Sequence, residues 1–468
     1  MLIYNANGPS GYRIANSLRF RSSASAYLNR TPSVAGNRNT WTWSGWVKRG
    51  ALGATQVIFE ATDATGTSVR ATNRFTSADT LDFSDSSSGL AATTTQVFRD
   101  PSAWYHIIVA MDTTQATASN RFKLYVNGVQ VTAFSSITYP TQNANTLFNS
   151  TSYFNYIGAT RPAFSQYFDG YLADINFIDG QALTPSSFGE TDATTGVWKP
   201  KQYSGTYGTN GFKLNFSNGT STTTLGYDSS GNGNNWTTNN ISLTAGSTYD
   251  WMLDSPTPLV GTSYGVGNYA VLNPLAKTSL SNVDTANMRV YWTNNASATL
   301  GAQTATMQIP TSGKYYFEGD ITYDGNNGFN IGICGIQDIA YGNNVNPSKT
   351  RYYRGSANAG NYGYGNETGL SNNNSNPSSG SMLSVAIDMD NGKFWVAING
   401  TWQGGGNPAT GTSPGYSDLI TAGVKWIPYF GGYNWTGTQT ISNVNFGQRP
   451  FAFSPPSGYK SLCTYNLP

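Results

Sequence analysis

The segment Phe122-Lys-Leu-Tyr-Val126, followed directly by Asn127-Gly128, decides the class of fold. It is short and rich in aromatic and aliphatic residues, as strands are. The Asn-Gly pair favours a hairpin turn whose central residues need positive φ angles. The sequence therefore predicts a β-hairpin here. Two further Asn-Gly pairs, Asn391-Gly392 and Asn399-Gly400, predict hairpin turns in the second half of the chain.

Similar short segments fill the rest of the chain, and helical periodicity is almost absent. Lys393–Ile398 is a predicted strand, and within it Phe394–Ile398 alternates as a strand does when one face lies in a core and the other in water. The best helical candidate is one turn at Thr184–Phe188, with Thr184 as N-cap and Pro185 in the first position. Such regular strands predict a sandwich or jelly roll. The other predicted strands are Ser17–Arg21, Thr40–Lys48, Gln56–Glu60, Trp104–Met111, Asn155–Ala159, Tyr171–Ile178, Tyr315–Ile321, Gly328–Cys334, Met382–Asp388, Trp426–Phe430 and Ile441–Phe446.

Length and composition indicate a folded chain of two domains. The chain has 468 residues, of which 11% are charged and 14% are aromatic. A single hydrophobic core stops growing at about 250–300 residues, and the aromatic side chains supply the apolar surface that a chain with few charges needs in order to fold. We predict an all-β protein with two antiparallel β-sandwiches in tandem, at 1–216 and 264–468. The turn-rich stretch 217–263 is predicted to be a connector whose aromatic residues pack on a neighbour.

Charge and cysteine usage limit the classes of binding partner and indicate the redox compartment in which the chain folds. The net charge is +2 with scattered basic residues, so we expect neither nucleic acid nor an anionic membrane as partner. No apolar run approaches the roughly 20 residues that cross a bilayer, and the first residues lack the pattern of a signal peptide. Cys334 and Cys463 are expected to be free, packed thiols. A virion protein, which folds in a reducing cell and works outside it, fits these features.

Several motifs resemble known families. About residues 12–216 resemble the concanavalin A-like, laminin-G-type domains, and about 264–468 resemble a SPRY domain. The first resemblance rests on Trp41–Trp46, Trp104–Val109, Phe122–Val129 and Phe168–Ile175, and the second on Tyr315–Gly319, Val385–Trp395 and Asn399–Trp402.

The end of the chain resembles the C-termini of bacteriophage tail and fibre-type proteins that combine these two modules. This resemblance rests on Asn445–Phe451, Pro455-Pro456 and Asn466–Pro468. It implies a virion structural protein, a surface fibre, spike or appendage, whose lectin-like domains contact a host cell-surface glycan or envelope component. It also implies other virion proteins as partners and a homo-oligomer, with a trimer favoured by analogy. The alternative is a purely structural decoration or connector protein that binds only other virion subunits.

Residues for catalysis are scarce, so we predict that the protein is not an enzyme. Glycoside hydrolysis needs two carboxyl groups about 5–5.5 Å apart or further, and no two glutamates lie within reach on one strand. Asp388 and Asp390 are explained by turn chemistry. His106, the only histidine, lies in a predicted strand and is interpreted as structural. The four glutamates are Glu60, Glu190, Glu318 and Glu367, and Glu318 in particular is expected to be structural.

We expect no cofactor and no metal. Laminin-G-type domains often hold calcium on a loop rim, and the resemblance makes Asp112, Asp169 and Asp174 the available carboxylates. None of them belongs to a dense acidic run. Solvated turn aspartates are therefore the favoured interpretation.

The remaining chemistry is recognition through aromatic side chains. Tyrosine and tryptophan among Gly, Ser and Asn make adaptable binding surfaces, and the stretch 341–381 has loop character over more than the ~12–15 residues usual for a loop. We predict that this stretch, with Trp402 and 433–435, binds the ligand of the second domain. The alternative is an internal strand whose tyrosines fill the sandwich, and burial decides between them. The predicted ligand-binding residues are Arg351, Tyr352, Tyr353, Arg354, Tyr362, Tyr364, Trp402, Tyr433 and Trp435.

Overall fold

The computed structural model describes residues 11–467 except 66–67, 162–165, 258–264, 279, 293–300, 323–327, 337–348, 357–361, 367–368, 372–374, 422 and 434–439. Nearly every element in this part of the chain is a strand, which confirms the all-β prediction. The single described α-helix, α1 (Thr222–Leu225), has four residues, and the predicted turn is the 3₁₀ helix η4 (Pro185–Ser187) with Thr184 as N-cap. None of the described helices is long and apolar enough to span a membrane.

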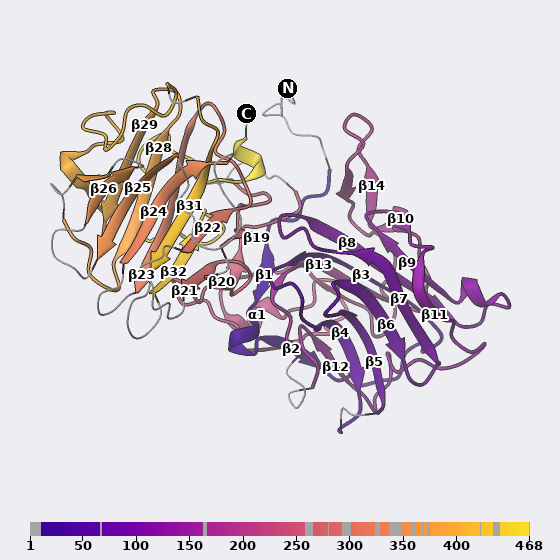
Figure 1. Cartoon of the computed structure of the whole chain (residues 1–468). Helices are drawn as coiled ribbons and strands as arrows, with labels where there is room; N and C mark the ends of the chain where they lie inside the picture. Colours follow the sequence, from indigo (N-terminus) through magenta and orange to yellow (C-terminus); the bar gives the residue numbers. More distant parts are fainter. Residues whose placement is uncertain are drawn as a thin grey trace. The chain divides into compact units, whose positions relative to one another are not determined.

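The chain forms two compact units, each a β-sandwich (Figure 1). The N-terminal unit comprises Pro9–Thr244 and Thr248–Leu259, and the C-terminal unit comprises chiefly Val260–Pro468. The predicted boundary at 216 is therefore too early. Two strands from the predicted connector complete the N-terminal sheets. β17 (Thr237–Asn239) pairs with β2 (Tyr27–Arg30), and β18 (Trp251–Met252) pairs with β1 (Ser17–Phe20). Trp236, also from this stretch, is buried against Phe212 with ring centroids 5.0 Å apart.

Two eight-stranded antiparallel sheets build the N-terminal unit. Sheet A has the order β10-β9-β8-β3-β13-β1-β18, with β16 also paired to β13, and sheet B has the order β11-β7-β6-β5-β4-β12-β2-β17. The strands of sheet A are β1 (Ser17–Phe20), β3 (Thr40–Arg49), β8 (Trp104–Asp112), β9 (Phe122–Val126), β10 (Val129–Gln130), β13 (Gly170–Asp179), β16 (Phe212–Leu214) and β18 (Trp251–Met252). Those of sheet B are β2 (Tyr27–Arg30), β4 (Gln56–Thr62), β5 (Arg70–Phe75), β6 (Thr80–Asp85), β7 (Leu90–Val97), β11 (Phe134–Thr138), β12 (Phe154–Ile157) and β17 (Thr237–Asn239). A separate hairpin joins β14 (Gly189–Thr191) and β15 (Trp198–Pro200).

The main core lies between the two sheets. Alternation along β8 points Ile107, Val109 and Met111 into this core, where they join Phe59 and Phe83 of sheet B. The same alternation sends the intervening residues of β8 to the outer face of sheet A. The outer face is where the functional residues described below lie.

The C-terminal unit contains two seven-stranded antiparallel sheets. Sheet C has the order β19-β22-β31-β24-β25-β26-β27, and sheet D has the order β20-β21-β32-β23-β28-β29-β30. Phe317 of sheet D meets Phe430 of sheet C at 6.0 Å, so a core lies between them. The strands are β19 (Leu272–Lys277), β20 (Ser281–Asp284), β21 (Arg289–Trp292), β22 (Gly301–Ala305), β23 (Lys314–Thr322), β24 (Gly328–Gly335), β25 (Thr350–Ser356), β26 (Gly363–Asn366), β27 (Gly369–Ser371), β28 (Met382–Asp388), β29 (Lys393–Ile398), β30 (Thr401–Trp402), β31 (Trp426–Tyr433) and β32 (Thr440–Asn445).

The predicted hairpin turns are present, with one difference. Asn127 and Asn399 have φ of 48° and their glycines φ of 81°, as a two-residue Asn-Gly turn requires. The β28–β29 connection is longer, and only Gly392 has positive φ there. Asp388 accepts hydrogen bonds from the backbone N–H groups of Asp390 and Asn391, as the turn interpretation predicted. The two cysteines are free and buried, also as predicted.

Candidate functional site

The binding residues predicted in the C-terminal unit do not form one surface. The stretch read as loop contains strands β25, β26 and β27, which corrects the prediction. Tyr353 and Tyr364 are 0% and 5% exposed, and their rings meet edge to face at 5.1 Å inside the sandwich. The Tyr364 hydroxyl donates to the carbonyl of Val396 of the facing sheet, and Phe394 lies 6.4 Å away. These tyrosines are core residues, so the internal-strand alternative holds.

The other predicted binding residues that the structure describes lie on separate parts of the C-terminal unit. Tyr352 is buried on the outer side of sheet C, and the Arg354 guanidinium lies 5.6 Å from its ring. Arg351 forms an ion pair with Asp418 at 2.5 Å. Trp402 is half-buried in a cluster on the outer side of sheet D. Tyr362 is half-buried just before β26, the side chain of Tyr433 at the end of β31 lies outside the described residues, and so does Trp435.

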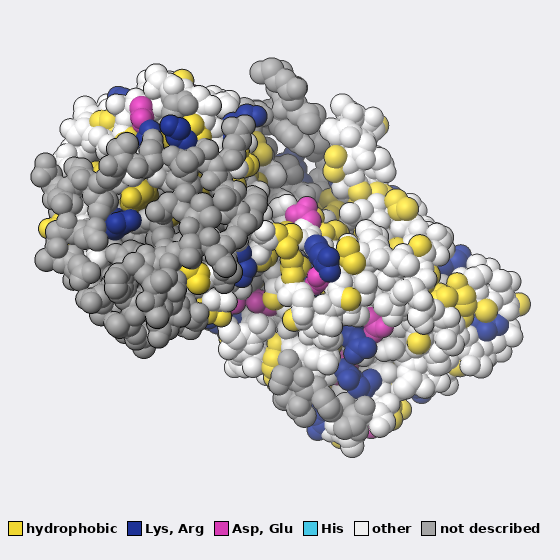
Figure 2. Space-filling view, viewed as in Figure 1, with side chains coloured by type: hydrophobic (Ala, Val, Ile, Leu, Met, Phe, Trp, Pro, Cys, Tyr) yellow, Lys and Arg dark blue, Asp and Glu magenta, His cyan; other side chains and the backbone are white. Residues whose placement is uncertain are grey.

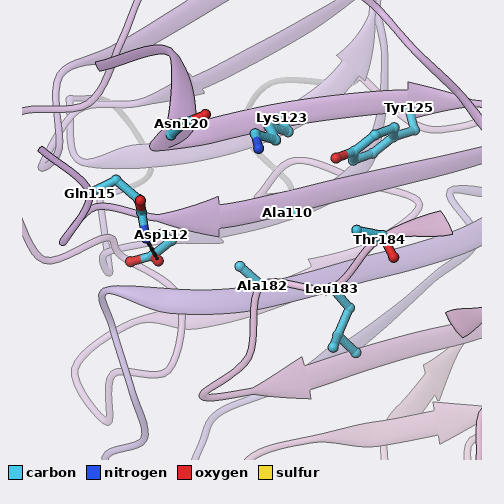
Figure 3. Close-up of a pocket in the computed structure, with 9 residues that line it drawn as sticks. All are labelled: Ala110, Asp112, Gln115, Asn120, Lys123, Tyr125, Ala182, Leu183 and Thr184. Carbon is cyan, nitrogen blue, oxygen red and sulfur yellow. Dashed lines mark hydrogen bonds between the residues drawn. The ribbon is translucent and has the colours of Figure 1, made fainter. Parts of the chain in front are cut away.

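The outer face of sheet A offers a better candidate. A second apolar cluster covers part of this face, formed by Ile108, Ala110 and Tyr125 of the sheet with Phe188 from the segment that follows β13. Where this covering segment starts, at 182–184, it leaves a hollow of about 220 Å³ beside β8 and β9 (Figure 3). The residues that line the hollow are Ala110, Asp112, Gln115, Asn120, Lys123, Tyr125, Ala182, Leu183 and Thr184.

Local hydrogen bonds fix both rims of the hollow. On one side the Thr42 hydroxyl donates to the carbonyl of Gln181 at 2.7 Å and accepts from the N–H of Leu183 at 2.8 Å, which ties the covering segment to β3. On the other side the Arg121 guanidinium donates to the carbonyls of Gln115 and Ala116, each at 2.8 Å. The hollow is therefore bounded by backbone that is already ordered.

Asp112 is the single carboxyl group among the lining residues. Its Oδ2 accepts from the Gln115 amide at 2.6 Å (Figure 3). Its Oδ1 accepts from the N–H and the hydroxyl of Thr114 at 3.1 and 2.6 Å. Burial works to raise the pKa of Asp112, but the hydrogen bonds from Thr114 and Gln115 outweigh it, so the pKa lies below its ordinary value. The group is an ionised acceptor at neutral pH.

Three polar groups of the hollow have open hydrogen-bonding capacity. The Lys123 ammonium, the Tyr125 hydroxyl and the Asn120 side-chain amide form no hydrogen bond with any residue in the part of the chain that the structure describes. Lys123 and Tyr125 extend from neighbouring outward positions of β9 (Figure 3). Burial of Tyr125 raises the pKa of its phenol, which keeps it a hydrogen-bond donor. The arrangement combines a cation, a neutral donor and an amide with the apolar Leu183 side chain.

This donor set suits binding rather than hydrolysis. A glycosidase needs two carboxyl groups across the scissile bond, whereas the lining residues contribute Asp112 alone. The volume lies below the ~300–1,000 Å³ of sites for drug-sized ligands, so the hollow admits one ring-sized polar group. In the sequence, Lys123 and Tyr125 stand out only as part of a predicted strand. Their outward positions between core residues Phe122, Leu124 and Val126 are the pattern that could have identified them.

His106 is structural, as predicted. It is 1% exposed on the outer face of sheet A, and the Trp46 ring stacks on it at 4.6 Å. Trp198 donates its indole N–H to Nδ1 at 2.9 Å, so the proton of the neutral ring is on Nε2, which lies 2.8 Å from the Ser44 hydroxyl. In this tautomer the ring donates to Ser44 and cannot take its proton, so the pair is no activated nucleophile.

Glu318 also has structural contacts. Its Oε1 accepts from the N–H of Ala452 at 2.7 Å and from the Asn445 amide at 3.2 Å, and its Oε2 accepts from the N–H of Phe453 at 3.3 Å. Burial raises the pKa of Glu318, and these hydrogen bonds oppose the rise. The residue holds a C-terminal loop to β23.

Two of the three aspartates considered for calcium differ from expectation. Asp169 and Asp174 are buried rather than solvated, and Asp174 is bound by Lys213 at 3.3 Å. Asp112 caps its own turn, as expected. Among the described residues, no three His, Cys, Asp or Glu side chains gather as they would around a metal ion.

A basic patch on sheet B is a weaker candidate than the hollow. Figure 2 shows lysine or arginine side chains close together over β4 and β5. Arg70 of β5 pairs with Glu60 at 2.7 Å and Arg74 pairs with Asp82 at 2.8 Å. Their charges are largely compensated within the sheet.

Comparison with solved structures gives only distant likenesses. The SPRY domain of human HERC1 is 16% identical with a TM-score of 0.28, covering 38% of this chain and 99% of that one. Domains LG4-5 of the mouse laminin alpha1 chain are 9% identical with a TM-score of 0.30, covering 95% and 94%. The SAP-like pentraxin of Limulus polyphemus is 16% identical with a TM-score of 0.26, covering 36% and 78%. These TM-scores are too low to support an argument about function.

A protein-family model matches part of the N-terminal unit. No curated protein matches the chain. Residues 21–188 match the family model described as the concanavalin A-like lectin/glucanases superfamily. Every residue that lines the hollow lies within this range. The N-terminal unit therefore has a concanavalin A-like, laminin-G-type fold.

Proposed function

We propose that the protein is a non-enzymatic, lectin-like recognition protein that binds one sugar unit of a cell-surface glycan in the hollow beside β8 and β9. The observation that carries the proposal is that Lys123, Tyr125 and Asn120 have open hydrogen-bonding capacity in the hollow. They lie there with the Asp112 carboxylate, which Gln115 holds in place through a hydrogen bond. A sugar ring offers several hydroxyl groups for such donors and acceptors, and its apolar C–H faces suit the Tyr125 ring and Leu183. The match to a lectin-type family over 21–188 agrees with this chemistry.

The biological setting follows from the sequence resemblance to phage fibre-type proteins. We place the protein on the surface of a bacteriophage virion, as a homo-oligomeric appendage whose glycan belongs to the host envelope. Low charge and the free thiols Cys334 and Cys463 support folding in a reducing cell and work outside it.

One observation favours the purely structural alternative. Val129 of β10 and Val197 next to β15 are 71% and 60% exposed. Gly128 lies close to the Trp198 ring, so these two exposed valines belong to adjoining hairpins. Exposed apolar side chains at a sheet edge suit contact with another protein subunit.

A glycan array tests the proposal, with titration calorimetry on the best ligand. Lys123→Met should weaken binding about 10-fold or more and Tyr125→Phe about 5-fold, because hydrogen bonds to charged groups contribute roughly 1.5–3 kcal/mol and neutral ones about 1. Lys460→Met is a matched control, since it removes the same charge from an exposed lysine of the other unit. Binding that Lys123→Met and Tyr125→Phe leave unchanged would exclude the hollow. Binding to no glycan would favour the structural alternative.

A further inference from the structure

A buried polar cluster outside the hollow brings a lysine, an asparagine and an aspartate together. Asp174 and Asn176 lie on β13 (Figure 1), and Lys213 lies on the short strand β16. Asn176 and Lys213 are direct partners in the antiparallel pairing of these strands. All three are at most 7% exposed, and Tyr12 and Tyr207 cover them.

The aspartate bridges the two nitrogen atoms. The Lys213 ammonium lies 3.3 Å from Oδ1 of Asp174, and the Asn176 amide donates to Oδ2 at 3.4 Å. Lys213 also donates to the Tyr12 hydroxyl at 2.8 Å, which in turn donates to Oδ1 of Asp174 at 2.7 Å. The Tyr207 hydroxyl donates to the carbonyl oxygen of Asn176 at 2.8 Å. One carboxyl group therefore contacts both an amine and a carboxamide.

The backbone at Asp174 has an unusual conformation. Asp174 has φ of +46°, a conformation that residues other than glycine rarely adopt, and it lies in a β-bulge where the pairing of β13 with β3 shifts. Strained positions of this kind concentrate at functional sites.

We propose that Lys213 and Asn176 condense into an intramolecular amide bond, with Asp174 carrying the proton. The neutral Nζ of Lys213 attacks Cγ of Asn176, a new C–N bond forms, and the bond from Cγ to Nδ2 breaks. Asp174 takes a proton from Nζ and delivers one to Nδ2, which leaves as ammonia. Overall, a lysine ammonium and a carboxamide give a secondary amide and an ammonium ion, and Asp174 returns to its starting state.

The surroundings favour each step. Oδ1 of Asp174 lies 3.3 Å from the Lys213 ammonium, so this carboxylate is within reach of the lysine proton. Burial and the charge of Asp174 raise the pKa of Tyr12, so Tyr12 stays protonated and keeps Asp174 in place. The Tyr207 hydroxyl is positioned to stabilise the oxyanion that forms on Oδ1 of Asn176.

Another buried lysine supplies a matched comparison. Lys48 contacts the carboxylate of Asp254 at 2.7 Å, and the other oxygen of Asp254 accepts from the Trp104 indole at 3.0 Å. Lys48 therefore contacts a carboxylate. Lys213, by contrast, has a carboxamide, Asn176, held beside the same carboxylate, Asp174. We expect Lys48 to remain a free amine in an ion pair.

Intact mass spectrometry of the purified full chain tests the proposal. The wild type should be lighter than its sequence by about 17 Da, one ammonia, and a protease digest should contain one cross-linked peptide pair joined at Asn176 and Lys213. Lys213→Arg and Asp174→Asn should each restore the sequence mass, while Lys48→Arg should keep the deficit. A wild type at its full sequence mass overturns the proposal. A deficit that survives Lys213→Arg also overturns it, because ammonia loss would then come from a succinimide at an Asn-Gly pair.

Discussion

Replacement of His106 should change how the stability of the N-terminal unit depends on pH. The imidazole is buried between Trp46 and Trp198, and its two nitrogens are committed to Trp198 and Ser44. Burial lowers the pKa of His106 from 6.5 to about 3. A protonated ring would also turn Nδ1 into a donor that faces the indole N–H of Trp198.

The direction in which stability changes with pH follows from how many protons the folded and unfolded states bind. The folded state resists protonation, so the unfolded chain binds more protons between pH 6.5 and about 3, and stability falls as the pH falls through this window. Above pH 6.5 the neutral His106 makes its full contribution to the free energy of unfolding. The difference between 6.5 and about 3, at about 1.4 kcal/mol per pKa unit, amounts to roughly 5 kcal/mol. Between pH 6.5 and 5 the loss is about 2 kcal/mol, before most carboxylates titrate.

His106→Gln tests this reasoning, because glutamine can donate to Ser44 but takes up no proton. Urea unfolding of the wild type at pH 7 and pH 5 should differ by about 2 kcal/mol, and this difference should be absent in the variant. The imidazole of the chain's single histidine should also show no titration in NMR spectra down to pH 4.5. An imidazole that titrates near pH 6.5, or a variant with the same pH dependence as the wild type, would refute the reasoning.

Two further predictions concern buried groups. Lys48→Ala should lower the free energy of unfolding by about 3–5 kcal/mol, because Asp254 is left as an uncompensated buried charge; urea titration measures this, and a loss below about 1 kcal/mol would contradict it. Cys334 and Cys463 should stay unreactive toward a thiol reagent at pH 8 until denaturant is added, because both are buried and burial raises the pKa of Cys463. Rapid labelling in native buffer would show that one of them is accessible.

The strands were predictable because their residues satisfy local and tertiary preferences together. Phe122–Val126, Met382–Asp388 and Lys393–Ile398 have the predicted bounds, and Asn127-Gly128 forms the expected turn. In such segments the alternation of side chains and the turn residues specify the same structure. The domain boundary was harder to predict, because the described part of the turn-rich stretch 217–263 holds only two short strands.

The tyrosines of the C-terminal unit were assigned to a loop because of the glycines among them. In the structure, glycines inside and outside the stretch 341–381 admit aromatic rings. A Cβ at Gly355, inside the stretch, would lie 2.3 Å from the ring of Phe329. A side chain at Gly415 would meet the ring of Tyr364 at 2.2 Å, so the absence of a Cβ there lets the tyrosine occupy the core. A composition of tyrosine and glycine therefore does not distinguish an adaptable surface loop from a core in which tyrosine rings pack on backbone.

The position of the hollow follows from the way sheet A is covered. Trp198 of the segment after β13 covers His106, and Asp254 of the segment after β18 contacts Lys48, so that both residues are at most 1% exposed. Such buried polar groups must each find a partner, and His106 and Lys48 do so with Trp198 and Asp254. Lys123 and Tyr125 lie where this cover ends, and their polar groups keep their bonding capacity toward solvent. A ligand there would replace water on groups that the fold has already positioned, so little reorganisation would oppose binding.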